Sequence, residues 1–203
     1  MTLYLLRHSL TRANEQRLYC GKTDLSLSPA GADLARRMAR RGGYPSAEGL
    51  DLYTSGLARA EETFLLLFGA LPHTPFPPFQ EMDFGAFEMY SYEQLKDRPD
   101  YQSWLSDQQG DVPCPGGECR RQTQARVLAG AEALLARGRD ALVLCHGGPI
   151  AALMGAWFPG EKRSRYQWQP GHCEGWAVFF RDGSPLSYSP LPAPGGEGGQ
   201  DEP

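Results

Sequence analysis

Polar side chains that could do chemistry follow three apolar runs of the chain. Each run is short and rich in residues that favour strands, which is typical of a β-strand. They are residues 3–6, followed by Arg7 and His8; residues 50–54, followed by Ser55 and Arg59; and residues 141–145, followed by His146 and Gly147. Because the carboxyl ends of parallel strands meet at one edge of a sheet, we expect these side chains to lie close together.

Such a group of two guanidinium groups, two imidazoles and a glycine-rich helix start suits a phosphate. Arginine forks match phosphate oxygens, and helix N-termini offer free N–H groups and a positive dipole end. A metal site is the main alternative for two histidines. It fits less well, because no carboxylate or cysteine stands at ligand spacing beside His8 or His146, and flanking arginine repels a cation. His73 and His172, each taken alone, are interpreted as structural.

Helical patterns separate the strand candidates. Ser28-Pro29 is typical of a helix start, apolar residues recur at helical spacing over 57–71 and 127–135, and Gly147-Gly148-Pro149 opens another helix. The Pro-rich segment 72–78 cannot be a central strand. The sequence predicts a hairpin from residues 176–180 and 185–188 around Asp182-Gly183. The alternation predicts an α/β fold, a three-layer structure with a mostly parallel sheet flanked by helices.

The chain length suits one domain with a full hydrophobic core. We expect this domain over residues 1–188, with an irregular cap excursion over about 79–119. The remaining residues, 189–203, are rich in Pro and Gly and acidic, and we expect them to be disordered.

Composition excludes several classes of protein. The 203 residues include 20 Lys and Arg against 24 Asp and Glu, a formal net charge of −4, which argues against nucleic acid or a membrane surface as partner. No signal peptide or membrane span is recognisable, so we expect a cytoplasmic protein. The five cysteines form no C-x-x-C pair, and Cys114 and Cys119 are expected to be free thiols.

Five segments resemble, in order, the motifs of the histidine phosphatase superfamily, which is also called the phosphoglycerate mutase-like family. The resemblance covers roughly residues 3–180. The segments are Arg7-His8 with Asn14; Gly21-Lys22-Thr23-Asp24 with Leu27-Ser28; Thr54-Ser55 with Arg59-Ala60 and Thr63; Glu81 with Phe84-Gly85 and Phe87-Glu88; and Cys145-His146-Gly147-Gly148. Several motifs in register are far more specific than any single one.

The resemblance implies a mechanism and assigns roles. His8 is the expected nucleophile, and it would form a phosphohistidine. Arg7, Arg59 and His146 are expected to hold the phosphoryl oxygens and stabilise the transition state, with Asn14 and Gly147 also binding phosphate. No cofactor and no metal are expected, because side chains supply the positive charge.

Glu81 matches the general acid of the family. Asp83 and Glu88 lie nearby, but the spacing of Glu81 to Phe84-Gly85 matches the motif. Glu81 would protonate the leaving oxygen and then deprotonate the attacking water.

The sequence departs from the family pattern at three positions. Ser9 stands where glycine is usual, Leu10 where an acidic residue is usual, and Met89 where the family has the glycine of Trp-Glu-Gly. Ser9 fits only if this position does not need a positive φ. Leu10 and Met89 would make the pocket more apolar, which bears on the substrate more than on the chemistry.

The substrate expected from the resemblance is a small-molecule phosphomonoester. The chain looks most like an α-ribazole-5′-phosphate phosphatase of cobalamin synthesis, with the substrate pocket drawn from Ser9, Tyr19, Gly21, Thr23 and Phe84. The alternatives are a broad-specificity or sugar-phosphate phosphatase, a phosphoglycerate mutase, and an inactive phosphate-binding protein. The basic residues between Glu81 and His146 are interpreted mainly as a solvated helix face, which favours a phosphatase over a mutase. A monomer and a homodimer both remain open.

Overall fold

The computed structural model describes residues 1–193 and contains one six-stranded sheet. The strand order is β3-β2-β4-β1-β5-β6. The first four of these are parallel, and β5 and β6 run antiparallel at one edge. The bounds are β1 Thr2–Arg7, β2 Asp51–Thr54, β3 Thr74–Pro75, β4 Ala141–Cys145, β5 Gly175–Arg181 and β6 Ser184–Leu191. The predicted mostly parallel α/β sheet is therefore confirmed.

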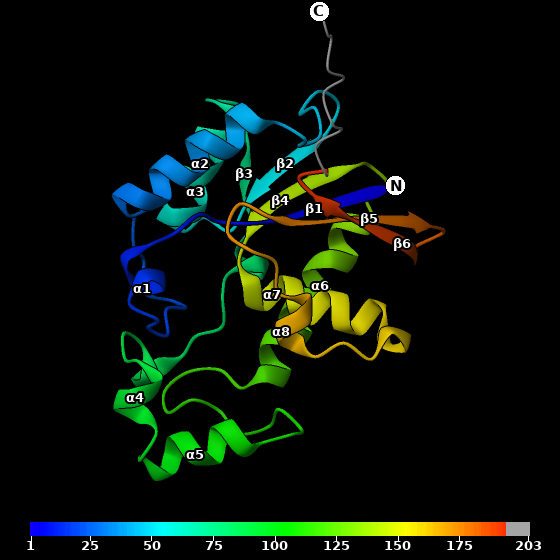
Figure 1. The fold of residues 1–203 in the computed structure, drawn as a ribbon. Helices are drawn as coiled ribbons and strands as arrows, with labels where there is room; N and C mark the ends of the chain where they lie inside the picture. Colours follow the sequence, from blue (N-terminus) through cyan, green and yellow to red (C-terminus); the bar gives the residue numbers. More distant parts are fainter. Residues whose placement is uncertain (194–203) are drawn as a thin grey trace, which may run out of the picture.

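Helices cover both faces of this sheet. Figure 1 shows α2 and α3 on one side and α6, α7 and α8 on the other, while α4 and α5 lie away from the sheet. The helices are α1 Arg12–Glu15, α2 Pro29–Arg41, α3 Ala58–Phe68, α4 Tyr92–Leu95, α5 Pro99–Ser106, α6 Arg120–Leu135, α7 Gly147–Trp157 and α8 Arg165–Trp168, with 3-10 turns η1 Pro77–Phe79, η2 Gly85–Phe87 and η3 Pro159–Glu161.

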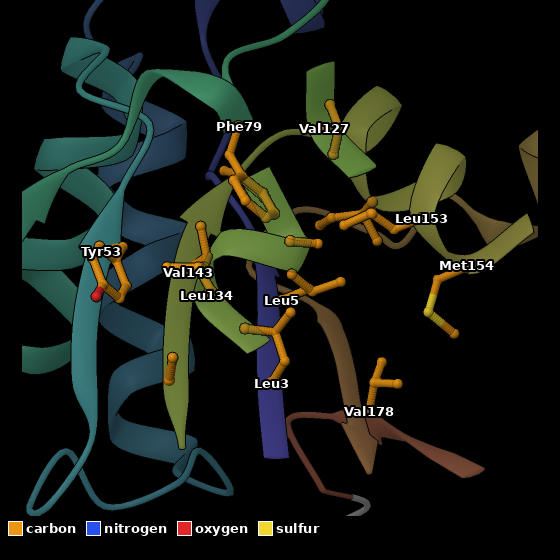
Figure 2. Packing of buried hydrophobic residues seen from close by; sticks show 14 of the residues in the cluster. Leu3, Leu5, Tyr53, Phe79, Val127, Leu134, Val143, Leu153, Met154 and Val178 are labelled. Atoms are coloured by element: carbon orange, nitrogen blue, oxygen red, sulfur yellow. The ribbon is translucent and has the colours of Figure 1, made fainter. Parts of the chain in front are cut away.

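The central strands are buried on both faces, because their side chains point into two hydrophobic cores, one on each side of the sheet. Leu3 and Leu5 of β1 face α6 and α7, where they pack with Val127 and Leu153 (Figure 2). Leu6 faces the other way, into a cluster that also holds Ala60 and Phe64 of α3. This alternation produces the three layers, since every second side chain of a strand points to the same face.

Local sequence signals set several element boundaries. The Ser28 hydroxyl accepts a hydrogen bond from the Gly31 N–H at 3.0 Å and caps α2, with Pro29 in its first turn. The hairpin between β5 and β6 turns at Asp182 and Gly183, whose φ angles of 50° and 75° fit a two-residue turn. The Pro-rich segment contributes the short edge strand β3 and the start of the 3-10 turn η1.

The excursion between β3 and β4 has a small core of its own. Phe87, Tyr101 and Trp104 are buried there with Met82 and Leu95, apart from the two cores that flank the sheet. Residues 79–119 therefore form a packed cap, in which the short helices α4 and α5 and the 3-10 turn η2 are joined by irregular segments.

The strand β6 continues to Leu191, beyond residue 188, where the sequence placed the end of the domain. The cause is the pairing of Gly175 with Leu191 across the β5–β6 hairpin, which a proline-rich composition does not reveal. The rest of the expected tail, residues 194–203, lies outside the described residues.

Candidate active site

The strand register brings the two catalytic histidine candidates together. Arg7 pairs with Cys145 across β1 and β4, so both strands end at the same level. His8 and His146 follow directly, and their ring centroids lie 5.0 Å apart. Both rings are buried, with only 5% and 0% of the residue exposed. Two histidines far apart in the sequence thus share one site at the carboxyl edge of the sheet.

The His8 ring is held in one tautomer. Its Nδ1 lies 2.5 Å from the backbone carbonyl oxygen of Ser9, which can only accept a hydrogen bond. Nδ1 therefore carries the proton, and the lone pair sits on Nε2. Burial lowers the pKa of His8 well below its usual value, and the charges of Arg59 and Arg7 lower it further. The ring is consequently neutral at pH 7, as a nitrogen nucleophile must be.

Arg59 fixes the tautomer of His146 in the same way. The Arg59 Nε–H donates to Nδ1 of His146 at 3.3 Å, so the proton of that ring sits on Nε2. This Nε2–H lies 2.8 Å from the hydroxyl oxygen of Ser55, to which it donates. Burial and then the charge of Arg59 hold the pKa of His146 well below its usual value.

A short loop, residues 21–23, holds the other end of Arg59. Its Nη atoms donate to the carbonyl oxygens of Thr23 at 3.0 Å and Gly21 at 2.7 Å. Glu88 holds this loop in turn, because its carboxylate accepts hydrogen bonds from the N–H groups of Gly21, Lys22 and Thr23. A Cβ on Gly21 would lie 1.7 Å from the carbonyl oxygen of residue 82, so only glycine fits.

Arg7 enters the site with an unused donor. Its Nη1 donates to the carbonyl oxygen of Pro170 at 2.8 Å, whereas its Nε is buried and has no hydrogen-bond partner within residues 1–193. Burial lowers the pKa of Arg7, and the nearby Glu81 carboxylate partly offsets this effect. A buried guanidinium N–H without a partner is costly unless a ligand accepts from it.

Glu81 lies at the N-terminus of α7. Its two carboxylate oxygens accept from the N–H groups of Gly148 at 3.0 Å and Met82 at 2.9 Å. A Cβ on Gly148 would lie 2.1 Å from Oε1 of Glu81, so the glycine makes room for the carboxylate. Glu81 is thus bound to the second residue after His146, at the same edge of the sheet as both histidines.

A cavity of about 510 Å³ is lined by Arg7, Glu81 and Gly148, and the buried side chains of His8, Arg59 and His146 lie outside its lining. Its walls carry aromatic, acidic and basic side chains from the β1–α1 region, the cap and the α8 region. The residues that line it are Arg7, Asn14, Leu18, Tyr19, Cys20, Glu81, Phe84, Trp104, Leu105, Arg120, Gly148, Arg165, Tyr166 and Gln169. Trp104 is 7% exposed, and its buried Nε1–H makes no hydrogen bond to the described part of the chain.

Asn14, Tyr19 and Phe84 occupy the wall where the sequence placed them. The Asn14 side-chain oxygen accepts from the Thr11 N–H in the capping box of α1, and Asn14 lines the cavity. Tyr19 packs against Phe84 with ring centroids 5.1 Å apart.

The remaining pocket candidates, Ser9, Gly21 and Thr23, do not line the cavity, and neither does Gly147, which was predicted to bind phosphate. The Ser9 hydroxyl donates to the carbonyl oxygen of Gly31 at 2.7 Å, its side chain is fully buried, and its φ is not positive. Gly21 and Thr23 hold Arg59, as described above, and Gly147 packs against Gln169. Neither Leu10 nor Met89 lines the cavity, so they do not make it more apolar.

Several residues at the site were not predicted from the sequence. The His172 ring lies 5.6 Å from that of His8, and its Nδ1 donates to the His8 carbonyl oxygen at 3.0 Å. Arg120 lines the cavity, although the basic residues of its helix were expected mainly on a solvated face. Trp104 and Arg165 also line it, and no local motif marked either of them.

The fold and site define a class of protein: an α/β protein with two buried neutral histidines, two arginines and a glutamate at the carboxyl edge of its sheet. Residues 3–185 match the family model of the histidine phosphatase superfamily, branch 1. The chain belongs to this superfamily, whose members include phosphatases and mutases.

Similar proteins carry both activities in their names. A 2,3-bisphosphoglycerate-dependent phosphoglycerate mutase of Methylorubrum extorquens is 32% identical over 165 residues, which are 75% of this chain and 76% of that protein. The structure of an α-ribazole phosphatase from Shigella flexneri has a TM-score of 0.80 at 26% identity and covers 97% of this chain and 100% of that chain. A phosphoglycerate mutase structure from Thermus thermophilus has a TM-score of 0.72 at 32% identity, covering 93% of this chain and 98% of that chain.

Among residues 1–193, no helix is both long and apolar enough to span a bilayer.

Proposed function

We propose that this protein hydrolyses phosphomonoesters through a phosphohistidine formed on His8, without a metal. One observation carries the proposal: the Ser9 carbonyl oxygen binds Nδ1–H of a neutral His8, which leaves the Nε2 lone pair for attack. Arg7 and Arg59 stand beside this ring and supply the positive charge that a phosphoryl group requires.

In the first step, the Nε2 lone pair of His8 forms the bond to phosphorus and the ester P–O bond breaks. The electron pair of that bond leaves with the alcohol oxygen, and Glu81 in its protonated form gives this oxygen a proton. The unused Nε–H of Arg7 and the Asn14 amide are donors for the phosphoryl oxygens.

In the second step, water attacks the phosphohistidine. Glu81, now a carboxylate, takes a proton from the water, the P–N bond breaks, and His8 regains its lone pair. Because Glu81 sits on the N–H groups of Gly148 and Met82, it keeps one position for both steps. Two lower barriers replace one high barrier, as in other covalent catalysis.

For the substrate, we propose α-ribazole 5′-phosphate, which would place the protein in cobalamin synthesis. Tyr19, Phe84 and Trp104 give the cavity an aromatic wall onto which a planar base can stack. The unused Nε1–H of Trp104 is a donor for a polar atom of that base or its ribose. The similarity to an α-ribazole phosphatase over nearly the whole chain supports this choice.

A mutase is the second candidate, because the sequence relative from Methylorubrum extorquens bears that name. A mutase must return the phosphoryl group to a second hydroxyl of the same substrate, and for that it must keep water out. A sugar-phosphate or broad-specificity phosphatase would share the chemistry of His8 but not the preference for a leaving group with an aromatic base.

The test measures phosphate release from p-nitrophenyl phosphate and α-ribazole 5′-phosphate in excess EDTA. We expect turnover by the wild type, none by His8→Ala, and full turnover by the control variant His73→Gln, since His73 is bound to Glu61 and does not line the cavity. When the phosphoryl group of the substrate carries a radioactive label, rapid quenching without acid should leave the label on His8, since phosphohistidine is labile in acid. Unchanged turnover by His8→Ala would show that His8 is not the nucleophile.

Two further measurements distinguish the alternatives. Conversion of 3-phosphoglycerate into 2-phosphoglycerate in the presence of 2,3-bisphosphoglycerate, without phosphate release, would identify a mutase. Phosphate binding without turnover of any substrate would identify an inactive binding protein.

A further inference from the structure

A second, smaller cavity of about 200 Å³ adjoins the active-site cavity on the side of α6, α7 and α8. These three helices lie next to one another in Figure 1. Arg120 and Arg165 line both cavities, so the two share a wall. The lining residues are Arg120, Thr123, Gln124, Ala151, Ala152, Gly155, Arg163, Arg165 and Trp168.

Among the described residues, the lining of this cavity has three guanidinium groups and no carboxylate, and Arg120 and Arg163 are each ion-paired with an acid outside the lining. The α7 wall is made of Ala151, Ala152 and Gly155, whose small side chains leave the space open. Although the chain has a net charge of −4, three arginine side chains lie together beside the active-site cavity. Guanidinium forks favour oxyanions with two or three oxygens.

The arginines are incompletely neutralised by the described residues. Within residues 1–193 the side chain of Arg165 forms no hydrogen bond and no ion pair, and its Nη2 lies beside Gly148, on the side where the Glu81 carboxylate is bound. Arg120 forms an ion pair with Asp107, and its buried Nη2, which lies 3.6 Å from Oδ2 of that residue, makes no hydrogen bond within residues 1–193. These two groups have donor capacity that no protein acceptor in the described chain uses.

The third arginine is held in place from behind. The Arg163 guanidinium stacks on the Trp168 ring at 4.7 Å and lies 3.4 Å from a carboxylate oxygen of Glu161. Stacking orients the planar group without using all its N–H donors. Unlike the other two, Arg163 lines only the smaller cavity.

We propose that Arg120, Arg163 and Arg165 form a second anion-binding subsite, which takes a phosphate or carboxylate group. The anion has two sources. It is either a second anionic group on the leaving group of the substrate, reaching past the shared wall, or a separate inorganic anion. The first source rests on the proposed hydrolase function, and the second does not.

One arm of the test compares matched substrates that differ by one anionic group. Adenosine 5′-monophosphate is paired with adenosine 3′,5′-bisphosphate, and glycerol 3-phosphate with 3-phosphoglycerate. If the substrate supplies the anion, at least one pair shows a kcat/KM preference of about 10- to 100-fold for the second anion, as expected for a charged hydrogen bond. Arg163→Gln should reduce this preference to less than about threefold and leave the singly anionic partner unchanged.

The other arm titrates inorganic phosphate into the protein by calorimetry. A separate anion gives two phosphate sites in the wild type and one in Arg163→Gln. Arg36→Gln, which removes a positive charge from an exposed pair with Asp33 on α2, is the matched control and should behave as wild type in both arms.

The outcomes separate the subsite from the proposed function. A single phosphate site together with no preference in either substrate pair overturns the subsite. If the wild-type protein hydrolyses none of these substrates, the proposed hydrolase function is refuted instead. The phosphate titration then still decides whether the second site exists.

Discussion

Arg59 donates a hydrogen bond from Nε to Nδ1 of His146 at 3.3 Å, while its Nη atoms are held by the loop 21–23. One fully buried guanidinium thus decides which nitrogen of His146 carries the proton and brings positive charge to the side of His8. Arginine can do both because its donors are arranged in a rigid fork and it stays charged when buried.

Replacing Arg59 by Gln should lower kcat/KM by about 10²–10³-fold, the usual effect of removing one preorganised donor from a transition state. It should also raise the pKa of His8, because the charge of Arg59 helps to depress it. In wild type, the acid limb of the kcat/KM profile should lie below pH 6.5, since His8 is already neutral there. In the variant, the acid limb should move to higher pH. A shift to lower pH would contradict the assignment of this limb to His8.

Glu88 is a positioning residue for Arg59, acting through the loop 21–23. Glu88→Gln places an amide NH₂ against backbone N–H donors, so the loop and Arg59 should shift. We expect kcat/KM to fall about 10- to 100-fold, as for other small misplacements, and inhibition by orthovanadate to weaken in parallel. Glu93→Gln, in an exposed pair with Lys96, is the control. A loss of stability with unchanged vanadate inhibition would leave Glu88 with a structural role only.

Stability should fall as the solution is acidified, partly through His172. Burial, followed by the charge of Arg7, lowers the pKa of His172 to about 4 from its usual value of 6.5. The unfolded chain therefore takes up this proton first, and the stabilisation present above pH 6.5 is lost as pH falls towards 4. Its size is at most about 3 kcal/mol. Urea unfolding of His172→Asn at pH 7.5 and 4.5 should show a smaller acid-induced loss than wild type.

His73 provides a control of opposite sign. Burial opposes its charge, but hydrogen bonds to the Leu71 carbonyl oxygen and to Glu61 raise its pKa overall. Its contribution is therefore full below the unfolded pKa and is lost as pH rises. His73→Asn should steepen the loss of stability on acidification, and equal pH dependence in both variants would refute the assignment.

Met89→Gly should stabilise the protein. Met89 has a φ of 64° and is 37% exposed, so it occupies the left-handed region without much packing in return. Relief of that conformation, less the greater flexibility of glycine in the unfolded chain, should add about 0.5–1 kcal/mol. Met89→Ala separates the two effects, because it removes the side chain but keeps the strained backbone. A melting temperature no higher for glycine than for alanine would contradict the prediction.

The sequence by itself determined the architecture and the centre of the site. Strands and helices came from hydrophobic periodicity and capping residues, which are local properties of the chain. The parallel register of β1 and β4 then placed His8 beside His146, because polar residues directly followed both strands. The family motifs added Arg59 and Glu81, and the structure places Arg59 against His146 and Glu81 against Gly148, two residues further on.

Only the tertiary structure decided which side chains face the substrate. Ser9 and Trp104 show why: the first lies next to His8 in sequence but bonds to Gly31, and the second comes from the cap, far along the chain, to line the cavity. Arg120 and His172 likewise reach the site through packing between elements rather than through any local pattern. Side-chain direction depends on which elements pack together, and periodicity records only which face of each element is buried.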